Sequence, residues 1–428
     1  MAARVTKSNG TAVTIELTVD IGGTLLQAEE AICAALNEAG VAATAAALTR
    51  FDADGEPIVI GGEKWTAKAP EAKYYQTPYG EAHVVRHVYQ RSAGGKVFCP
   101  LEQGARILRN ATPRFAKMMA HKLSLGSAAD VQRDMQENHG RPISKLLAQE
   151  LSAFVAAVVQ AKEETWHYAT PALDEDITAI GVGIDGSCVL LCEGQWREAM
   201  TGTISLYDRA GERQHTAYVG AAPEHGKATF YARMEREMAH VRRLYPQARW
   251  IGIADGAASN WDFLGPHVDE QVLDFYHASE YVTQAADALF EGSPAAQRKA
   301  WLEQSCSTLK HDWDGASKLL GQWKAADTRG WKGARRKMLD ESIRYVENHR
   351  RQMHYKRYAD MGWPIGSGVT EAACKTLVKQ RLCRAGMRWT ESGAQVILSL
   401  RALLLSETRW DQFWRKIEQF GVPKIVSY

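Results

Sequence analysis

The chain has 428 residues, which is too long for one ordinary core and predicts two or three structural units. Its 52 Lys and Arg against 50 Asp and Glu leave a formal charge of only +2, which excludes a globally basic nucleic-acid binder, so any basic surface must be local. The seven cysteines are scattered and never spaced as Cys-x-x-Cys, so we expect reduced thiols in a cytosolic protein.

No segment approaches the uninterrupted apolar length of roughly 20 residues that a membrane helix requires, and the N-terminus lacks the apolar core of a signal peptide. From these absences we expect a protein of a bacterial cytoplasm, without a membrane partner.

Residues 1–100 predict a small α+β region, because period-two alternation at 11–19 is followed by an Ala- and Leu-rich stretch at 25–48. The turn Asp20-Ile21-Gly22-Gly23 resembles the phosphate turn of sugar kinases with the actin-like fold. In that fold a second strand follows the turn, whereas the residues here look helical, with Thr24 as N-cap. We therefore favour the helix over a kinase turn.

Residues 101–165 predict a helical, helix-turn-helix-like DNA-binding region. Ser127 is placed to cap a helix over 128–137, and Pro142 is expected to open the next helix at its first position. Near the start of that second helix, where a recognition helix meets base edges, are Ser144, Lys145 and Gln149. The alternative is an ordinary αα-hairpin.

A polar linker with Pro171 leads to a β-rich run at 177–192, which contains Asp185. If Asp185 lies inside this strand, alternation places it on one face with Gly181 and Gly183 and leaves that face bare for a metal and a phosphate backbone. The alternative is a tight hairpin, since Asp-Gly is a strong turn signal.

Strand-like runs at 196–207 and 214–219, a helix at 228–245 and a buried strand at 249–254 follow, and Asp255 stands at the end of that strand. A last strand-like run, 271–276, ends at His277 and leads into a helix. The order β-β-β-α-β-α-β-α is that of the core of the ribonuclease H-like fold, and we predict this α/β catalytic core over 171–290 and 361–405. Asp185 and Asp255 would then lie on adjacent strands, although Asp255-Gly256 could also be a turn.

Residues 291–360 show no strand pattern and predict an all-helical insertion. Positions 324–358 carry eleven basic and four acidic side chains, an excess of seven positive charges. Interleaved with aromatic rings, these side chains could hold phosphates and stack on bases, with Lys332, Arg335 and Arg336 as candidates. The commoner meaning is a solvated charged face over an aromatic core.

Glu371 falls in the first turn of a helix that opens after a Gly-Ser-Gly entry, where the helix dipole and Lys375 at i+4 would ordinarily explain a carboxylate. No acid separates it from Glu391. The expected DNA contacts of this basic stretch are Lys375, Lys379, Arg381, Arg384, Arg388 and Trp389. Residues 406–428 predict a C-terminal helix and tail.

These residues resemble the ISKra group of bacterial insertion-sequence transposases, which have an Asp-Asp-Glu (DDE) active site. The most specific stretches are 183–186, 250–256, 274–277 and the long segment 363–389. The resemblance implies that Asp185, Asp255 and Glu371 bind two Mg²⁺ or Mn²⁺ ions. It implies double-stranded DNA, both terminal inverted repeats and target, as the substrate.

The resemblance also implies a role for the Asp-x-x-His motif of Asp274 and His277, which is similar to a motif of Mutator-like transposases. His277 would be catalytic, near the scissile phosphate or the metal, and Asp274 would support it. The alternative is a His that merely caps a strand end.

Cleavage of the element ends and transfer of the 3′ ends to target DNA would use one site, with two ions roughly 4 Å apart. Two ends suggest a homodimer or higher homo-oligomer on the nucleoid. Two alternatives remain: a ribonuclease H-like nuclease or resolvase that joins nothing, and a non-catalytic DNA-binding protein derived from a transposase.

Overall fold

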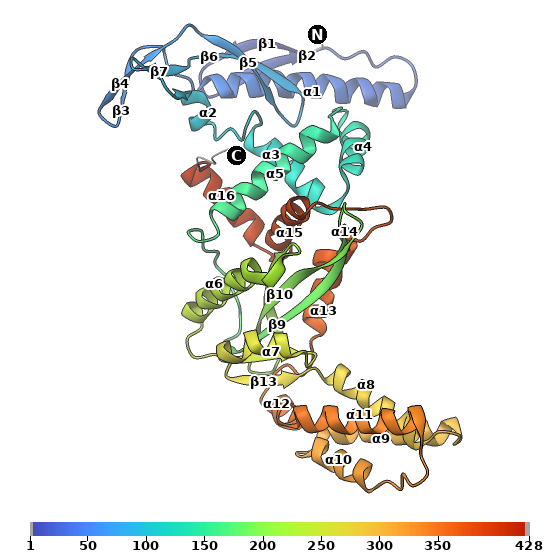
Figure 1. Ribbon diagram of the computed structural model, residues 1–428. Helices are drawn as coiled ribbons and strands as arrows, with labels where there is room; N and C mark the ends of the chain where they lie inside the picture. Colours follow the sequence, from blue (N-terminus) through green and yellow to red (C-terminus); the bar gives the residue numbers. More distant parts are fainter. Residues whose placement is uncertain (1–2, 424–428) are drawn as a thin grey trace. The chain divides into compact units, whose positions relative to one another are not determined.

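The computed structural model describes residues 3–423, which form two compact units (Figure 1). The first unit comprises the described chain up to Tyr168, together with Ser399–Leu404 and the segment from Arg409 onward. The second comprises Ala169–Leu398 and Leu405–Thr408. All of the acidic residues proposed above for the active site belong to the second unit.

The first unit begins with three antiparallel sheets and the long helix α1 (Leu25–Thr49), which contacts strands β1, β2 and β6. Thr24 caps α1 in a reciprocal capping box with Gln27, as the sequence predicts for a helix rather than a kinase turn. The strands are β1 (Ala3–Ser8), β2 (Val13–Leu17), β3 (Ile58–Ile60), β4 (Glu63–Ala67), β5 (Glu71–Gln76), β6 (Glu81–Arg86), β7 (Tyr89–Arg91) and β8 (Val97–Phe98).

Helix α1 is long enough and, on average, apolar enough to cross a membrane, although Glu29, Glu30 and Glu38 interrupt its apolar sequence. Among the described residues it is the one helix that meets both criteria, with a mean hydropathy of 1.5 over 18 residues of which 11% are buried. Many alanines between its few charged residues raise the mean hydropathy of the helix, although no long uninterrupted run of large apolar residues is present. Leu25, Leu26 and Leu36 are among its exposed side chains. One such helix near an N-terminus is weak support for a membrane span.

Helical residues complete the first unit, with α5 packed against both α3 and α4. Ser127 caps α4 together with Asp130, and Gly140 ends α4 in the left-handed conformation. The next helix starts later than predicted, because Ser144 and not Pro142 opens it: the Ser144 hydroxyl accepts a hydrogen bond from the Leu147 amide. The helices are α2 (Pro100–Gly104), α3 (Pro113–Leu125), α4 (Ala128–His139), α5 (Lys145–Ala161) and α16 (Arg409–Phe420).

A five-stranded mixed sheet in the order β11-β10-β9-β12-β13 organises the second unit (Figure 1). The first three strands form an antiparallel meander, and β12 pairs in parallel with both β9 and β13. The strands are β9 (Ile177–Leu190), β10 (Trp196–Asp208), β11 (Arg213–Ala221), β12 (Arg249–Ala254) and β13 (Glu270–Leu273). The chain is therefore of the mixed α/β class.

Helices cover the two faces of this sheet. Ile180, Val182 and Ile184 of β9 point into a core that includes Met234 and Met238 of α6 (Ala228–Leu244). The short helix α7 (Ala258–Leu264) adds Phe263 and Leu264 to the same core. The opposite face is packed by α13 (Gly368–Ala373) and the π-helical turn Cys374–Lys379 that continues it.

The glycine face of β9 is not open, contrary to the expectation from alternation. A methyl group on Gly183 would lie 2.0 Å from Thr370 Oγ1, and one on Gly181 would lie 3.3 Å from Pro364 Cγ. The glycines therefore make room for α13 and the segment before it, and this protein segment fills the space assigned to a phosphate backbone. Period-two alternation identifies a bare face but carries no information about what covers it.

Every described element between β13 and α13 is helical, and these helices share a core with β12 and β13 that includes Trp323, Tyr355 and Tyr358. They are α8 (Phe275–Leu289), α9 (Ala295–His311), α10 (Gly315–Ala325), α11 (Gly333–His349) and α12 (Tyr355–Asp360). After α13 the chain continues through α14 (Gln380–Leu382) to α15 (Glu391–Leu405).

The strand predicted at 271–276 ends earlier than expected. It stops at Leu273, Asp274 is the N-cap of α8, and His277 lies in the first turn of that helix. The Asp274 carboxylate, by accepting from the His277 amide, starts the helix in spite of the aromatic, strand-like residues between them.

Candidate active site

Asp185 lies inside β9, where it pairs with Thr201 of β10, so the Asp-Gly dipeptide is not a hairpin turn. Its Oδ1 accepts from the Gly186 amide at 2.7 Å, and its Oδ2 accepts from the Cys374 thiol at 3.2 Å. Burial raises the pKa of the Asp185 carboxyl, and the negative charges of Asp255 and Glu198 add to the effect. A bound cation would offset this cost of ionisation.

Asp255 follows the last residue of β12, at the carboxyl end of a parallel strand. Its Oδ1 accepts from the Ala257 amide and from Asn260 Nδ2, each at 3.1 Å. The register pairs Ile253 with Gly183, so Asp255 and Asp185 stand two residues further along two adjacent strands. The two carboxylates are close enough for the charge of Asp255 to act on the pKa of Asp185.

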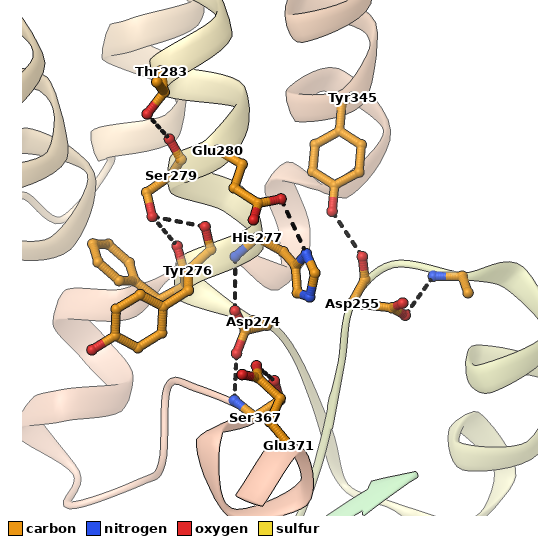
Figure 2. A network of polar contacts seen from close by, with 12 residues as sticks. Asp255, Asp274, Tyr276, His277, Ser279, Glu280, Thr283, Tyr345, Ser367 and Glu371 are labelled. Carbon is orange, nitrogen blue, oxygen red and sulfur yellow. Dashed lines mark hydrogen bonds and ion pairs between the residues drawn. The ribbon is translucent and has the colours of Figure 1, made fainter. Parts of the chain in front are cut away.

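Glu371 is exposed in the first turn of α13, and its Oε1 accepts from the Ser367 hydroxyl at 2.7 Å. Its helix is fixed to the sheet by a 2.8 Å hydrogen bond between the hydroxyls of Thr370 and Thr203. The helix dipole favours a carboxylate at this position, as the sequence indicates. The side chain faces the Asp-x-x-His segment (Figure 2).

Asp274, His277 and Glu371 form one cluster, in which one potential ligand atom from each lies within 4.8 Å of the other two. This is the one such group of three among residues 3–423. Asp274 is fully buried, and its two oxygens accept from the backbone amides of His277, at 2.8 Å, and of Ser367. Figure 2 shows it between these two segments, with His277 and Glu371 on either side.

A carboxylate–imidazole set of this kind fits a divalent cation, because its donors are oxygen and nitrogen atoms. The fit differs from the expectation in its partners: Glu371 meets Asp274 and His277, and the three acids Asp185, Asp255 and Glu371 are not all within 4.8 Å of one another. Both Asp274 oxygens already accept amide hydrogens, so this carboxylate has less capacity for an ion than Glu371.

The helical segment reaches the site through Tyr345 of α11, which sequence reasoning missed. Its hydroxyl donates to the backbone oxygen of Asp255 at 2.9 Å (Figure 2). Its ring stacks on Tyr281 with centroids 3.6 Å apart. No spacing rule relates positions 255 and 345, so the sequence carries no signal of this contact. Burial raises the pKa of Tyr345, which keeps the hydroxyl a donor.

We expect Tyr345→Phe to lower the cleavage rate, because the ring stack remains while the Asp255 loop loses its anchor. The free energy of unfolding should fall by about 1 kcal/mol. Tyr89→Phe is the matched control, because Tyr89 is a buried tyrosine of the first unit whose hydroxyl donates to the Glu56 oxygen at 3.0 Å. A cleavage defect equal in both variants would assign Tyr345 to general stability.

The residues predicted to contact DNA are placed differently from one another. Lys145 and Gln149 are exposed at the start of α5, whereas the Ser144 hydroxyl is used as the helix cap. Arg335 lies 3.7 Å over the Trp331 ring and donates to the Ala288 oxygen. Lys332 and Arg336 are exposed, and Arg336 pairs with Asp340 at 2.9 Å.

The basic residues that follow Glu371 also include both exposed and buried side chains. Exposed side chains are those of Lys375, Lys379, Arg384 and Arg388. Arg381 is only 2% exposed, with its guanidinium 5.0 Å from the centre of the Trp389 ring. Trp389 itself bonds to β9 through its backbone amide and to the Leu382 oxygen through its indole. These two side chains hold the loop together and do not form an open surface.

Comparison with known proteins does not extend these observations. The chain matches no protein-family model, and no curated protein is significantly similar to it.

Proposed function

We propose that the protein is a DDE transposase, which cleaves the ends of an insertion sequence and transfers the 3′ ends to target DNA. The observation that carries the proposal is the position of Asp185 within β9 and of Asp255 directly after the parallel neighbour β12. Cys374, which follows the helix of Glu371, is bonded to Asp185. The mixed sheet with an antiparallel meander and two parallel strands supports our proposal of a ribonuclease H-like core, and the run of helices after β13 supports the proposed insertion.

The side chains of the candidate site would have different roles in phosphodiester cleavage and joining. Asp185, Asp255 and Glu371 would hold two Mg²⁺ or Mn²⁺ ions, which supply the charge needed for in-line displacement when bound. A ring nitrogen of His277 lies within 4.8 Å of a Glu371 carboxylate oxygen, and we expect this imidazole to approach the scissile phosphate. Asp274 would orient His277 and Glu371. Its carboxylate accepts hydrogen bonds from the His277 amide and from the amide of Ser367, whose hydroxyl donates to Glu371.

The test is a cleavage and joining assay with the full chain and labelled DNA that carries the ends of its element. We expect cleavage with Mg²⁺ or Mn²⁺, loss of cleavage with a chelator, and joining of the cut 3′ ends to a target plasmid. Cleavage without joining would identify a nuclease or resolvase instead. Binding without cleavage under any divalent ion would identify a non-catalytic DNA-binding protein.

The first unit would bind the terminal repeat through the start of α5, where Lys145 and Gln149 are exposed. This unit includes segments from both ends of the chain, among them α16, so the test uses the full protein and not a fragment. The assembly would contain at least two copies, one for each DNA end.

We expect Lys145→Ala to weaken repeat binding and to reduce the slope of log affinity against log salt by about one, as for a lost phosphate contact. Gln149→Ala should instead lower the preference for the repeat over unrelated DNA. A gel-shift series at several salt concentrations measures both. Lys299→Ala, on an exposed face of α9, is the control. Unchanged binding by both α5 variants would remove α5 as the recognition helix.

A further inference from the structure

Cys374 is buried at the point where α13 passes into the π-helical turn, three residues after Glu371. Its sulfur lies 3.2 Å from Asp185 Oδ2. The helical segment that carries the proposed ligand Glu371 is therefore hydrogen-bonded directly to the proposed ligand Asp185. π-Helical turns occur frequently at functional sites. Cys374 is the one buried cysteine among the described residues, and the other six are exposed or half-buried.

The thiol is suited to be the donor in this contact. An S–H group can donate a hydrogen bond, whereas the oxygens of an ionised carboxylate can only accept one. Asp185 Oδ1 is meanwhile occupied by the Gly186 amide. Each oxygen of Asp185 therefore accepts one hydrogen bond, and the two bonds hold the carboxylate in one orientation. The remaining lone pairs point away from these two donors.

We propose that Cys374 is a positioning residue, which fixes the orientation of the Asp185 carboxylate and its spacing from Glu371. This inference rests on the proposed function, since Asp185 and Glu371 are taken as ligands of the same metal site. The thiol itself does not touch the metal or the DNA. It acts through Asp185, as hydrogen-bond donors behind metal ligands commonly do.

Metal dependence separates this role from a merely structural one. In the full chain, Cys374→Ala should raise the Mn²⁺ concentration for half-maximal cleavage by about tenfold or more, because the ligand orientation is lost. Cys374→Ser keeps a donor in the same place and should stay within about threefold of the unmodified protein. Direct Mn²⁺ binding, followed by electron paramagnetic resonance without DNA, should show the same order.

Cys306→Ala is the matched control, because Cys306 is a half-buried thiol packed in the helical core. It should leave the Mn²⁺ dependence unchanged. Equal Mn²⁺ dependence of Cys374→Ala and the unmodified protein would overturn the proposal, as would equal weakening by the Ala and Ser variants. Normal cleavage by Asp185→Asn would instead overturn the proposed function, so the two failures are distinguishable.

Discussion

Asp255→Ala and Glu371→Ala are each expected to lower Mg²⁺-dependent cleavage by at least about a thousandfold, equivalent to about 4 kcal/mol of transition-state stabilisation. The reason is that each variant removes the carboxylate oxygens proposed to bind the metal ions. Asp255 caps the turn after β12 through Ala257 and Asn260, and Glu371 is exposed at a helix start.

The measurement is single-turnover cleavage of labelled end DNA, with binding followed in parallel by gel shift. Binding should stay nearly unchanged, since neither residue belongs to the first unit. Glu303→Gln, on the exposed surface of α9, is the control and should cleave normally. A normal cleavage rate in either alanine variant would show that the acid in question is not a ligand.

Asp274→Ala is expected to lower the free energy of unfolding by about 3 kcal/mol. Its carboxylate is fully buried, and its loss leaves the amides of His277 and Ser367 without their acceptor. A lost helix cap costs about 1 kcal/mol, and a hydrogen bond to a buried charged group about 2 kcal/mol. Asp274→Asn keeps one acceptor oxygen and should cost less.

Denaturant unfolding measures this loss, and the residual cleavage of the folded variant measures its effect on the site. Asp314→Ala is the matched control, because Asp314 is also the N-cap residue of a helix but is exposed and makes no capping bond. It should change stability by less than about 0.5 kcal/mol. If the two alanine variants lost equal stability, the two amide contacts would not carry the effect.

Local patterns predict most of the sheet of the second unit. The bounds of β12 and the start of α6 agree with the sequence, because buried strands and amphipathic helices have distinct periods. The end of β13 differs from the prediction. Phe275 and Tyr276 are residues that favour strands, and they are helical here because the Asp274 side chain caps the helix. A cap depends on one side chain, and the periodic pattern of apolar residues gives no sign of it.

The sequence indicates the residue types of the candidate site but not the contacts among them. Asp185, Asp255 and Glu371 stand out because each acid follows an apolar or glycine-rich stretch. Contacts across long separations, such as Cys374 with Asp185 and Tyr345 with Asp255, follow from packing and have no local pattern. The close approach of Glu371 to His277 is of the same kind.

The helical segment between Asp274 and Ser367 leaves and re-enters the sheet at one point. Asp274 bonds to the Ser367 amide, and the Phe275 amide donates to the Ile365 oxygen at 3.0 Å. A segment whose two ends are pinned together can lengthen or shorten at little entropic cost, because closure entropy grows only with the logarithm of length. Relatives of this chain should therefore differ most in the size of this segment while keeping the two residues that close it.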